Sequence, residues 1–152
     1  MLDKNVDLKG KSILVTGSAG FIGSNLVKQL FKDAAGAHIV GFDNVNDYYD
    51  VSLKEYRLSE LDSLATGFSG TYEFVRGNLA DRELLISLFK KHHFNVVVNL
   101  AAQAGVRYSI TNPDVYIESN LIGFYNILEA CRKYPVSHLV YASSSSVCVW
   151  SR

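Results

Sequence analysis

An apolar segment, 12–16, runs directly into a glycine-rich turn, and this junction limits the possible folds of the chain more than any other feature. The turn carries three glycines at intervals of three residues, Gly17, Gly20 and Gly23. In dinucleotide-binding folds the first glycine permits a tight turn, the second lets the backbone approach a pyrophosphate, and the third lets the next helix pack closely on the sheet. The pattern therefore predicts an anion site between a strand and a helix N-terminus.

The residues on both sides of the turn support this prediction. Segment 11–16 has the apolar composition of a buried parallel strand. The apolar residues after the turn recur at helical spacing and are expected to share one helix face: Phe21, Ile22, Leu26, Val27 and Leu30.

A second predicted strand, 38–42, is followed by an acidic residue, Asp43, twenty residues after Gly23. A carboxylate there accepts hydrogen bonds from the adenosine ribose hydroxyls and repels a 2′-phosphate. Segment 44–46 contains no arginine that would neutralise such a phosphate, so the sequence favours NAD over NADP. The alternative is an ordinary strand-to-helix turn followed by a solvated aspartate.

Strand and helix patterns alternate along the chain, with strands expected near 12–16, 38–42, 72–75, 95–100 and 138–142. This alternation predicts an α/β fold with a doubly wound parallel sheet of the Rossmann type, in one domain. The leucines of 51–64 are expected to form one apolar stripe, and two prolines are expected to bound the longest helix, 113–134.

Composition excludes several classes of partner. Of the 152 residues, 48% are hydrophobic and 20% are charged, which is ordinary for a globular domain. Fifteen basic and fifteen acidic side chains leave no net charge, so we expect no nucleic-acid partner and no membrane partner. The N-terminal segment has no apolar run, so we expect no signal peptide and a cytoplasmic location.

The cysteines and histidines do not have the spacing of a metal site. Cys131 and Cys148 are expected to be free thiols, because the chain shows no export signal. His92 and His93 follow two lysines at a predicted helix end, where positive charge interacts favourably with the helix dipole. We therefore expect no metal ion.

Five separated segments resemble one family: 16–23, 43–50, 99–108, 116–123 and 140–147. They include the Gly-x-x-Gly-x-x-Gly turn, an Asn-Asp-Tyr-Tyr-Asp segment, an Ala-Ala-Gln-Ala-Gly-Val-Arg segment and a run of four serines. Together they resemble the extended short-chain dehydrogenase/reductases that act on nucleotide sugars, and are most similar to the UDP-glucuronate 4-epimerases. The likeness covers only the first half of a family member.

The resemblance implies NAD-dependent epimerisation of a UDP-sugar. In such enzymes NAD takes a hydride from C4 of the sugar and returns it to the other face of the 4-keto intermediate. A tyrosine in a Tyr-x-x-x-Lys pair acts as the base, and a serine or threonine hydrogen-bonds the 4-hydroxyl. That hydroxyl residue corresponds to Ser144, with Ser145 as a near alternative, although four serines after a strand could also form a polar loop.

The resemblance also implies a cofactor site at the carboxyl ends of the strands. Its residues would be Gly17, Gly20, Phe21, Ile22, Gly23, Asp43, Asn44, Asn46, Asp47, Tyr48, Asn78, Leu79, Leu100, Ala101, Ala102, Gln103 and Ser119. Asn78 stands where family members usually have an aspartate, and its amide oxygen can still accept a hydrogen bond from adenine.

Two further residues are expected on the substrate side. Arg107 could pair with the carboxylate or a phosphate of the sugar nucleotide, the alternative being a solvated arginine. Asn120 would approach the cofactor or the water of the active site. Tyr48 and Tyr49 border the substrate mouth or pack on the sheet edge.

Two features of the family pattern are missing from the sequence. No tyrosine is followed four residues later by a lysine, and the strand pattern stops after the fifth strand. We therefore expect a Rossmann domain over 1–152 that is incomplete at its C-terminal end, without the sugar-nucleotide domain and without turnover by itself.

Other functions remain open. A dehydratase or decarboxylase of the same superfamily is one, although dehydratases usually carry an Asp-Glu pair where Ser145 and Ser146 stand. A non-catalytic dinucleotide-binding fragment is another, and a methyltransferase is disfavoured by the glycine spacing and Asp43. The apolar face of helix 113–134 could form a homodimer or pack on the sheet.

Overall fold

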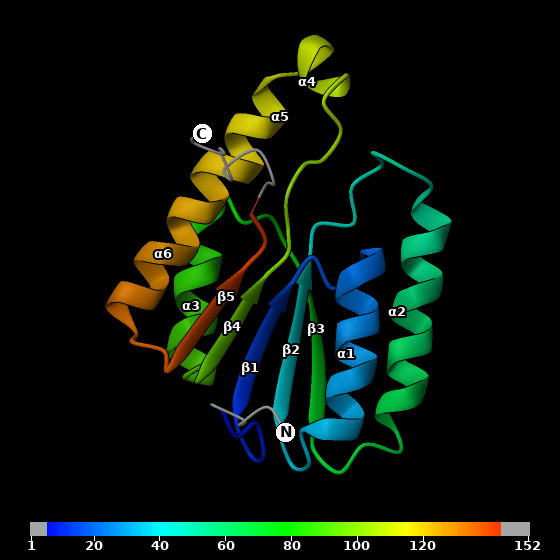
Figure 1. Cartoon of the computed structure of the whole chain (residues 1–152), viewed down its shortest axis with the longest axis vertical. Coiled ribbons are helices and arrows are strands. Elements are labelled where there is room, and N and C mark those ends of the chain that lie inside the picture. The colour runs from blue at the N-terminus through cyan, green and yellow to red at the C-terminus, as the bar shows by residue number, and fades with distance from the viewer. Residues whose placement is uncertain (1–5, 144–152) are drawn as a thin grey trace, which may run out of the picture.

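The computed structural model describes residues 6–143 and contains one parallel sheet of five strands (Figure 1). The strands are β1 Ser12–Thr16, β2 His38–Asp43, β3 Thr71–Arg76, β4 Val96–Asn99 and β5 His138–Tyr141. Their order is β3-β2-β1-β4-β5, so the chain first builds outward from β1 on one side and then crosses to the other. This confirms the predicted doubly wound Rossmann sheet and places its switch point between β1 and β4.

Helices cover both faces of the sheet (Figure 1). They are α1 Phe21–Asp33, α2 Val51–Ala65, α3 Arg82–His92, α4 Tyr108–Thr111, α5 Asp114–Tyr116, the π-helix η1 Ile117–Gly123 and α6 Phe124–Lys133. α1 and α2 lie on one face, and α3 and α6 lie on the other. Among the helices of residues 6–143, none has both the length and the apolar character required to cross a bilayer.

The side chains of β1 show how both faces are filled. Leu14 packs with Ile127 of α6 in the core on one face. Ile13 and Val15 pack with Val27 of α1 on the other. All five side chains are fully buried. Burial of each contributes about 2 kcal/mol, which is why a strand covered on both faces is apolar throughout.

The predicted apolar faces of α1 and α2 are only partly buried. Phe21 and Ile22, in the first turn of α1, are 71% and 68% exposed. In α2, Leu58 and Leu61 are buried but the other two stripe leucines, Leu53 and Leu64, are exposed at the two ends of the helix. α2 therefore packs on the domain through only part of the expected leucine stripe, together with Val51 and Lys54 of its first turn.

The predicted long helix 113–134 is correct in extent but is not a regular α-helix. α5 and α6 are joined by η1, whose wider π-type turns are frequent at functional sites. Gly123 ends η1 and is buried, and a Cβ on it would lie 2.8 Å from the Cβ of Leu79. The π-helix is thereby pressed against the loop that follows β3.

Cys131 is expected to react slowly with alkylating reagents. It is a half-buried free thiol in α6, and burial raises its pKa from 9.0 to about 11. Since the thiolate is the reactive form, alkylation by iodoacetamide at pH 8 should be about 100-fold slower than for an unperturbed thiol. Peptide mass mapping in the native and urea-unfolded chain measures this rate, and equal rates in the two states would contradict the prediction.

Candidate functional site

A cleft opens at the carboxyl ends of the strands, where the strand order reverses. Thirteen residues expected from the sequence line it: Gly17, Gly20, Asp43, Asn44, Asn46, Tyr48, Asn78, Leu79, Leu100, Ala101, Ala102, Gln103 and Ser119. Four residues that were not expected also line it: Phe42, Lys54, Gly77 and Ala104. Tyr49, which was expected at the substrate mouth or on the sheet edge, completes the lining. Ligands bind at this position in open α/β sheets.

The glycine turn forms the floor of the cleft. Gly17 has a φ of +71°, and a Cβ there would lie 2.8 Å from the Ala101 nitrogen. A Cβ on Gly23 would lie 2.1 Å from the Gly17 oxygen, so only glycine lets α1 start this close to the turn. Gly20 is the N-cap residue of α1, and no side-chain cap hydrogen bond to the start of this helix is found among the described residues. The N–H groups of the first helical turn are therefore available to an anion.

Thr16 ties β1 to the loop after β4. Its hydroxyl donates to Asn99 Oδ1 at 2.6 Å and accepts from the backbone N–H groups of Leu100 and Ala101, both at 3.2 Å. Thr16 and Asn99 are both buried. One hydroxyl thus holds a cleft-lining loop in place, a role that sequence reasoning missed because its partners lie more than 80 residues away.

Asp43 ends β2 and is buried at the cleft wall. Its Oδ2 accepts from the Ala19 N–H at 3.1 Å and its Oδ1 accepts from the Val45 N–H at 2.8 Å. Each carboxylate oxygen has a second lone pair, so both retain capacity for a ligand hydroxyl. Asp43 therefore joins the glycine turn to the loop after β2 and also presents acceptors to the cleft.

Lys54 brings a buried cation to the cleft. Its Nζ donates to the backbone oxygen and to Oδ1 of Asn46, at 2.7 and 2.6 Å, and lies 4.5 Å from the ring centroid of Tyr49. Burial lowers the pKa of Lys54, while the nearby Asp43 and Asp47 carboxylates oppose that shift. From the sequence this lysine looks like a solvated residue in the first turn of a helix.

The loop after β4 is held by residues of the long helical segment. Asn120 of η1 accepts from the Gln103 N–H at 2.8 Å and donates to the Gln103 carbonyl at 2.9 Å. The Tyr116 hydroxyl donates to the Ala104 carbonyl at 2.9 Å. Asn120 thus lies behind the lining, while its neighbour Ser119 lies in it.

The side-chain amide of Asn78 forms hydrogen bonds within the protein both as a donor and as an acceptor. It donates to Glu118 Oε1 at 2.6 Å and accepts from the Ala80 N–H at 2.9 Å. The second lone pair of the amide oxygen is left for a ligand.

Other expected site residues lie outside the lining. Phe21, Ile22 and Asp47 are exposed beside the cleft, and Gly23 supports its floor from below. Arg107 is exposed at the start of α4, and within 6–143 its guanidinium forms no ion pair. Ser144 and Ser145 lie outside the described residues.

Tyr48, which lines the cleft, belongs to a group of neighbouring tyrosines. Tyr48 and Tyr108 have ring centroids 5.1 Å apart, and Tyr108 and Tyr116 have centroids 6.3 Å apart. A Cβ on Gly105, whose φ is +96°, would collide with the Tyr48 hydroxyl. Tyr48 therefore bridges the loop after β2 and the loop after β4.

Several proteins are similar to this chain. Protein CapI of Staphylococcus aureus is 50% identical over 135 residues, which are 89% of this chain and 38% of that protein. UDP-glucuronate 4-epimerase 4 of Arabidopsis thaliana is 47% identical over 139 residues, which are 91% of this chain and 30% of that protein. The chain thus spans well under half the length of these relatives.

A solved structure shares the fold. The crystal structure of UDP-glucose-4-epimerase from Stenotrophomonas maltophila, with bound NAD and formylated UDP-arabinopyranose, superposes with a TM-score of 0.73 at 30% identity. The match covers 90% of this chain and 38% of that one.

A family model described as GDP-mannose 4,6 dehydratase matches residues 14–148, nearly the whole chain. The chain therefore belongs to this family, within the extended short-chain dehydrogenase/reductases that its sequence resembles.

Proposed function

We propose that this chain is the NAD-binding portion of a nucleotide-sugar 4-epimerase that interconverts UDP-glucuronate and UDP-galacturonate. The observation that carries the proposal is the cleft at the switch point, which joins an open helix N-terminus to the Asp43 carboxylate. The likeness to a UDP-glucuronate 4-epimerase and to an epimerase structure with bound NAD supports the same chemistry.

The residues of the cleft fit a dinucleotide. The glycine turn and the first turn of α1 would hold the pyrophosphate, and Asp43 would accept hydrogen bonds from the adenosine ribose hydroxyls. Leu100 to Gln103 would line the nicotinamide side. When bound, NAD supplies a hydride acceptor for C4 of the sugar and returns the hydride to the opposite face.

The substrate would be bound by residues near the loop after β4. In this proposal Arg107 pairs with the uronate carboxylate or a phosphate, and Ser144 or Ser145 hydrogen-bonds the 4-hydroxyl. Because the 152 residues contain no Tyr-x-x-x-Lys pair, we propose that the chain does not turn over substrate by itself. Elimination, as in a dehydratase, is disfavoured by Ser145 and Ser146 at the positions of the Asp-Glu pair.

We further propose a homodimer through segment 113–134. One side of this segment packs on the sheet through Ile127 and Ala130. Other apolar side chains of the segment remain exposed: Ile117, Leu121, Ile122, Tyr125 and Leu128.

Calorimetric titration of the purified chain with NAD and NADP tests the proposal. NAD is expected to bind at least about tenfold more tightly than NADP, because the Asp43 carboxylate repels a 2′-phosphate. Asp43→Asn should weaken NAD binding about tenfold, since hydrogen bonds to a charged acceptor are lost, and should reduce the preference for NAD.

Asp62→Asn is the matched control, because Asp62 is exposed on α2 and lies outside both the lining and the expected site. It should bind NAD as the parent chain does. A folded parent chain that binds neither nucleotide would refute cofactor binding. Formation of UDP-galacturonate from UDP-glucuronate by the chain alone would refute the proposed lack of turnover.

A further inference from the structure

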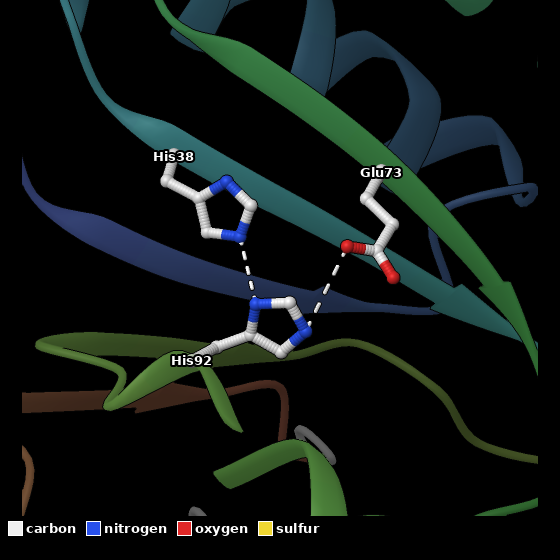
Figure 2. A group of neighbouring side chains, drawn as sticks. All are labelled: His38, Glu73 and His92. Carbon is white, nitrogen blue, oxygen red and sulfur yellow. Dashed lines mark hydrogen bonds and ion pairs between the residues drawn. The ribbon is translucent and has the colours of Figure 1, made fainter. Parts of the chain in front are cut away.

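Three side chains with metal-binding atoms meet at the end of the sheet opposite the cleft. His38 is the first residue of β2, Glu73 lies in β3, and His92 is the last residue of α3 (Figure 2). One ligand atom from each side chain lies within 4.8 Å of the others. His92 was expected from the sequence to interact with the helix dipole, and no metal ion was expected, because the three residues are far apart in the chain.

The ring planes of His38 and His92 are nearly parallel. His38 Nε2 lies 2.8 Å from His92 Nδ1, with the rings inclined by 20°. On the other side of its ring, His38 Nδ1 lies 2.5 Å from Thr71 Oγ1. When the hydroxyl accepts the Nδ1 proton, the Nε2 lone pair accepts the proton of His92 Nδ1. A metal bound to Nε2 would replace that hydrogen bond, and the Thr71 hydroxyl would hold the ring as the outer partners of ligating histidines do.

His92 is the buried member of the cluster. Its side chain is only 5% exposed, and its Nε2 has no hydrogen-bond partner within 6–143. The nearest charged atom is Glu73 Oε2, 3.8 Å away (Figure 2). An unpaired nitrogen in the protein interior costs free energy, and that cost is removed when the nitrogen binds a cation.

Glu73 is engaged at present by a competing cation. The Lys91 ammonium lies 3.0 and 3.3 Å from the two Glu73 carboxylate oxygens. Both side chains are partly exposed, at 62% for Lys91 and 38% for Glu73. Lys91 can therefore leave and Glu73 can rotate without disturbing the core.

We propose that His38, Glu73 and His92 bind a divalent transition-metal ion of the zinc class. Two imidazoles and one carboxylate match the ligand preference of Zn²⁺, whereas Ca²⁺ and Mg²⁺ prefer sites made of oxygen ligands. Tetrahedral zinc places its ligands about 3.4 Å apart, so the cluster contracts modestly on binding and water completes the shell. The ion joins β2, β3 and α3.

Zinc titration of the whole 152-residue chain against a chromogenic zinc indicator tests this site. The parent chain should bind one equivalent. His38→Gln and Glu73→Gln should each weaken binding by at least about 100-fold through loss of a ligand. Saturating zinc should raise the melting temperature of the parent by about 5 °C, because the ion binds only the folded chain.

Two further variants distinguish metal binding from general effects on the fold. Lys91→Gln should increase zinc affinity about twofold to fivefold, since the competing ammonium is removed. His93→Asn is the matched control and should bind zinc unchanged, because His93 is exposed and asparagine tolerates its φ of +47°. The circular dichroism spectra of His38→Gln and Glu73→Gln are compared with that of the parent chain to confirm that both variants fold. Glu73→Gln is expected to fold because the Glu73 side chain is partly exposed.

Absence of one-equivalent binding by the parent chain would overturn the proposal. So would folded His38→Gln and Glu73→Gln chains that bind as the parent does, or loss of binding in His93→Asn. The cluster lies at the opposite end of the strands from the cleft, so none of these results bears on NAD binding.

Discussion

Replacing Gly23 by alanine is expected to lower the free energy of unfolding by about 3 kcal/mol or more and to abolish NAD binding. The new Cβ would lie 2.1 Å from the Gly17 oxygen, 2.7 Å from the Gly17 carbonyl carbon and 2.9 Å from the Ser18 Cα. All three are backbone atoms, so no side-chain rotation relieves the contact. α1 must move away from the turn, and its N-terminus then no longer faces the cleft.

Gly67→Ala is the control for this substitution. A Cβ at Gly67 meets only the Leu64 oxygen at 3.9 Å, which is ordinary contact. Its free energy of unfolding, from urea titration followed by circular dichroism, should stay within about 1 kcal/mol of the parent value. Equal destabilisation by the two substitutions would show that the close approach of α1 to the turn is not what requires glycine at position 23.

Thr16→Val is expected to cost about 2 to 4 kcal/mol although it nearly preserves side-chain shape. It removes the only hydrogen bond to Asn99 Oδ1 found within 6–143 and the hydroxyl that accepts from the Ala101 N–H. The Leu100 N–H keeps its bond to the Thr16 carbonyl at 3.3 Å. The buried Asn99 Oδ1 and the part-buried Ala101 N–H thus lose these partners, and the loop that lines the cleft loses its anchor.

Thr16→Ser separates the hydroxyl from the methyl group. It keeps the hydroxyl and loses one methyl, so it should cost about 1 kcal/mol. Urea titration of both variants measures the two values, and NAD titration should show weaker binding for valine than for serine. A serine variant as unstable as the valine variant would assign the role of Thr16 to packing instead.

The positions of the strands were predictable because their cause is local. A parallel strand covered on both faces is mostly apolar, and the predicted segments 12–16 and 38–42 match the buried strands β1 and β2 within one residue at each end. The helices were less predictable, since a helix buries only the part of its apolar face that meets a neighbour. Leu53 and Leu64 fit the stripe of α2 and are nevertheless exposed.

Some of the cleft residues could likewise be predicted from the sequence, and others could not. Those that directly follow strands, such as Asp43 and Leu100, could be predicted because the carboxyl ends of parallel strands share one edge of the sheet. Lys54 could not, because it is buried by its contacts with Asn46 and Tyr49, in the loop before α2. The NAD-binding roles of all these residues remain predictions that the titrations above will test.

Local patterns in the chain were sufficient to establish the alternation of strands and helices, the glycine turn and the acid after the second strand. Each depends on residues within a few positions of one another, and backbone sterics and burial act at that range. The tertiary structure determined which polar residues form hydrogen bonds with each other: Thr16 with Asn99, Gln103 with Asn120, and His38 with His92. These partners are 83, 17 and 54 residues apart, and sheet register and helix placement bring them together.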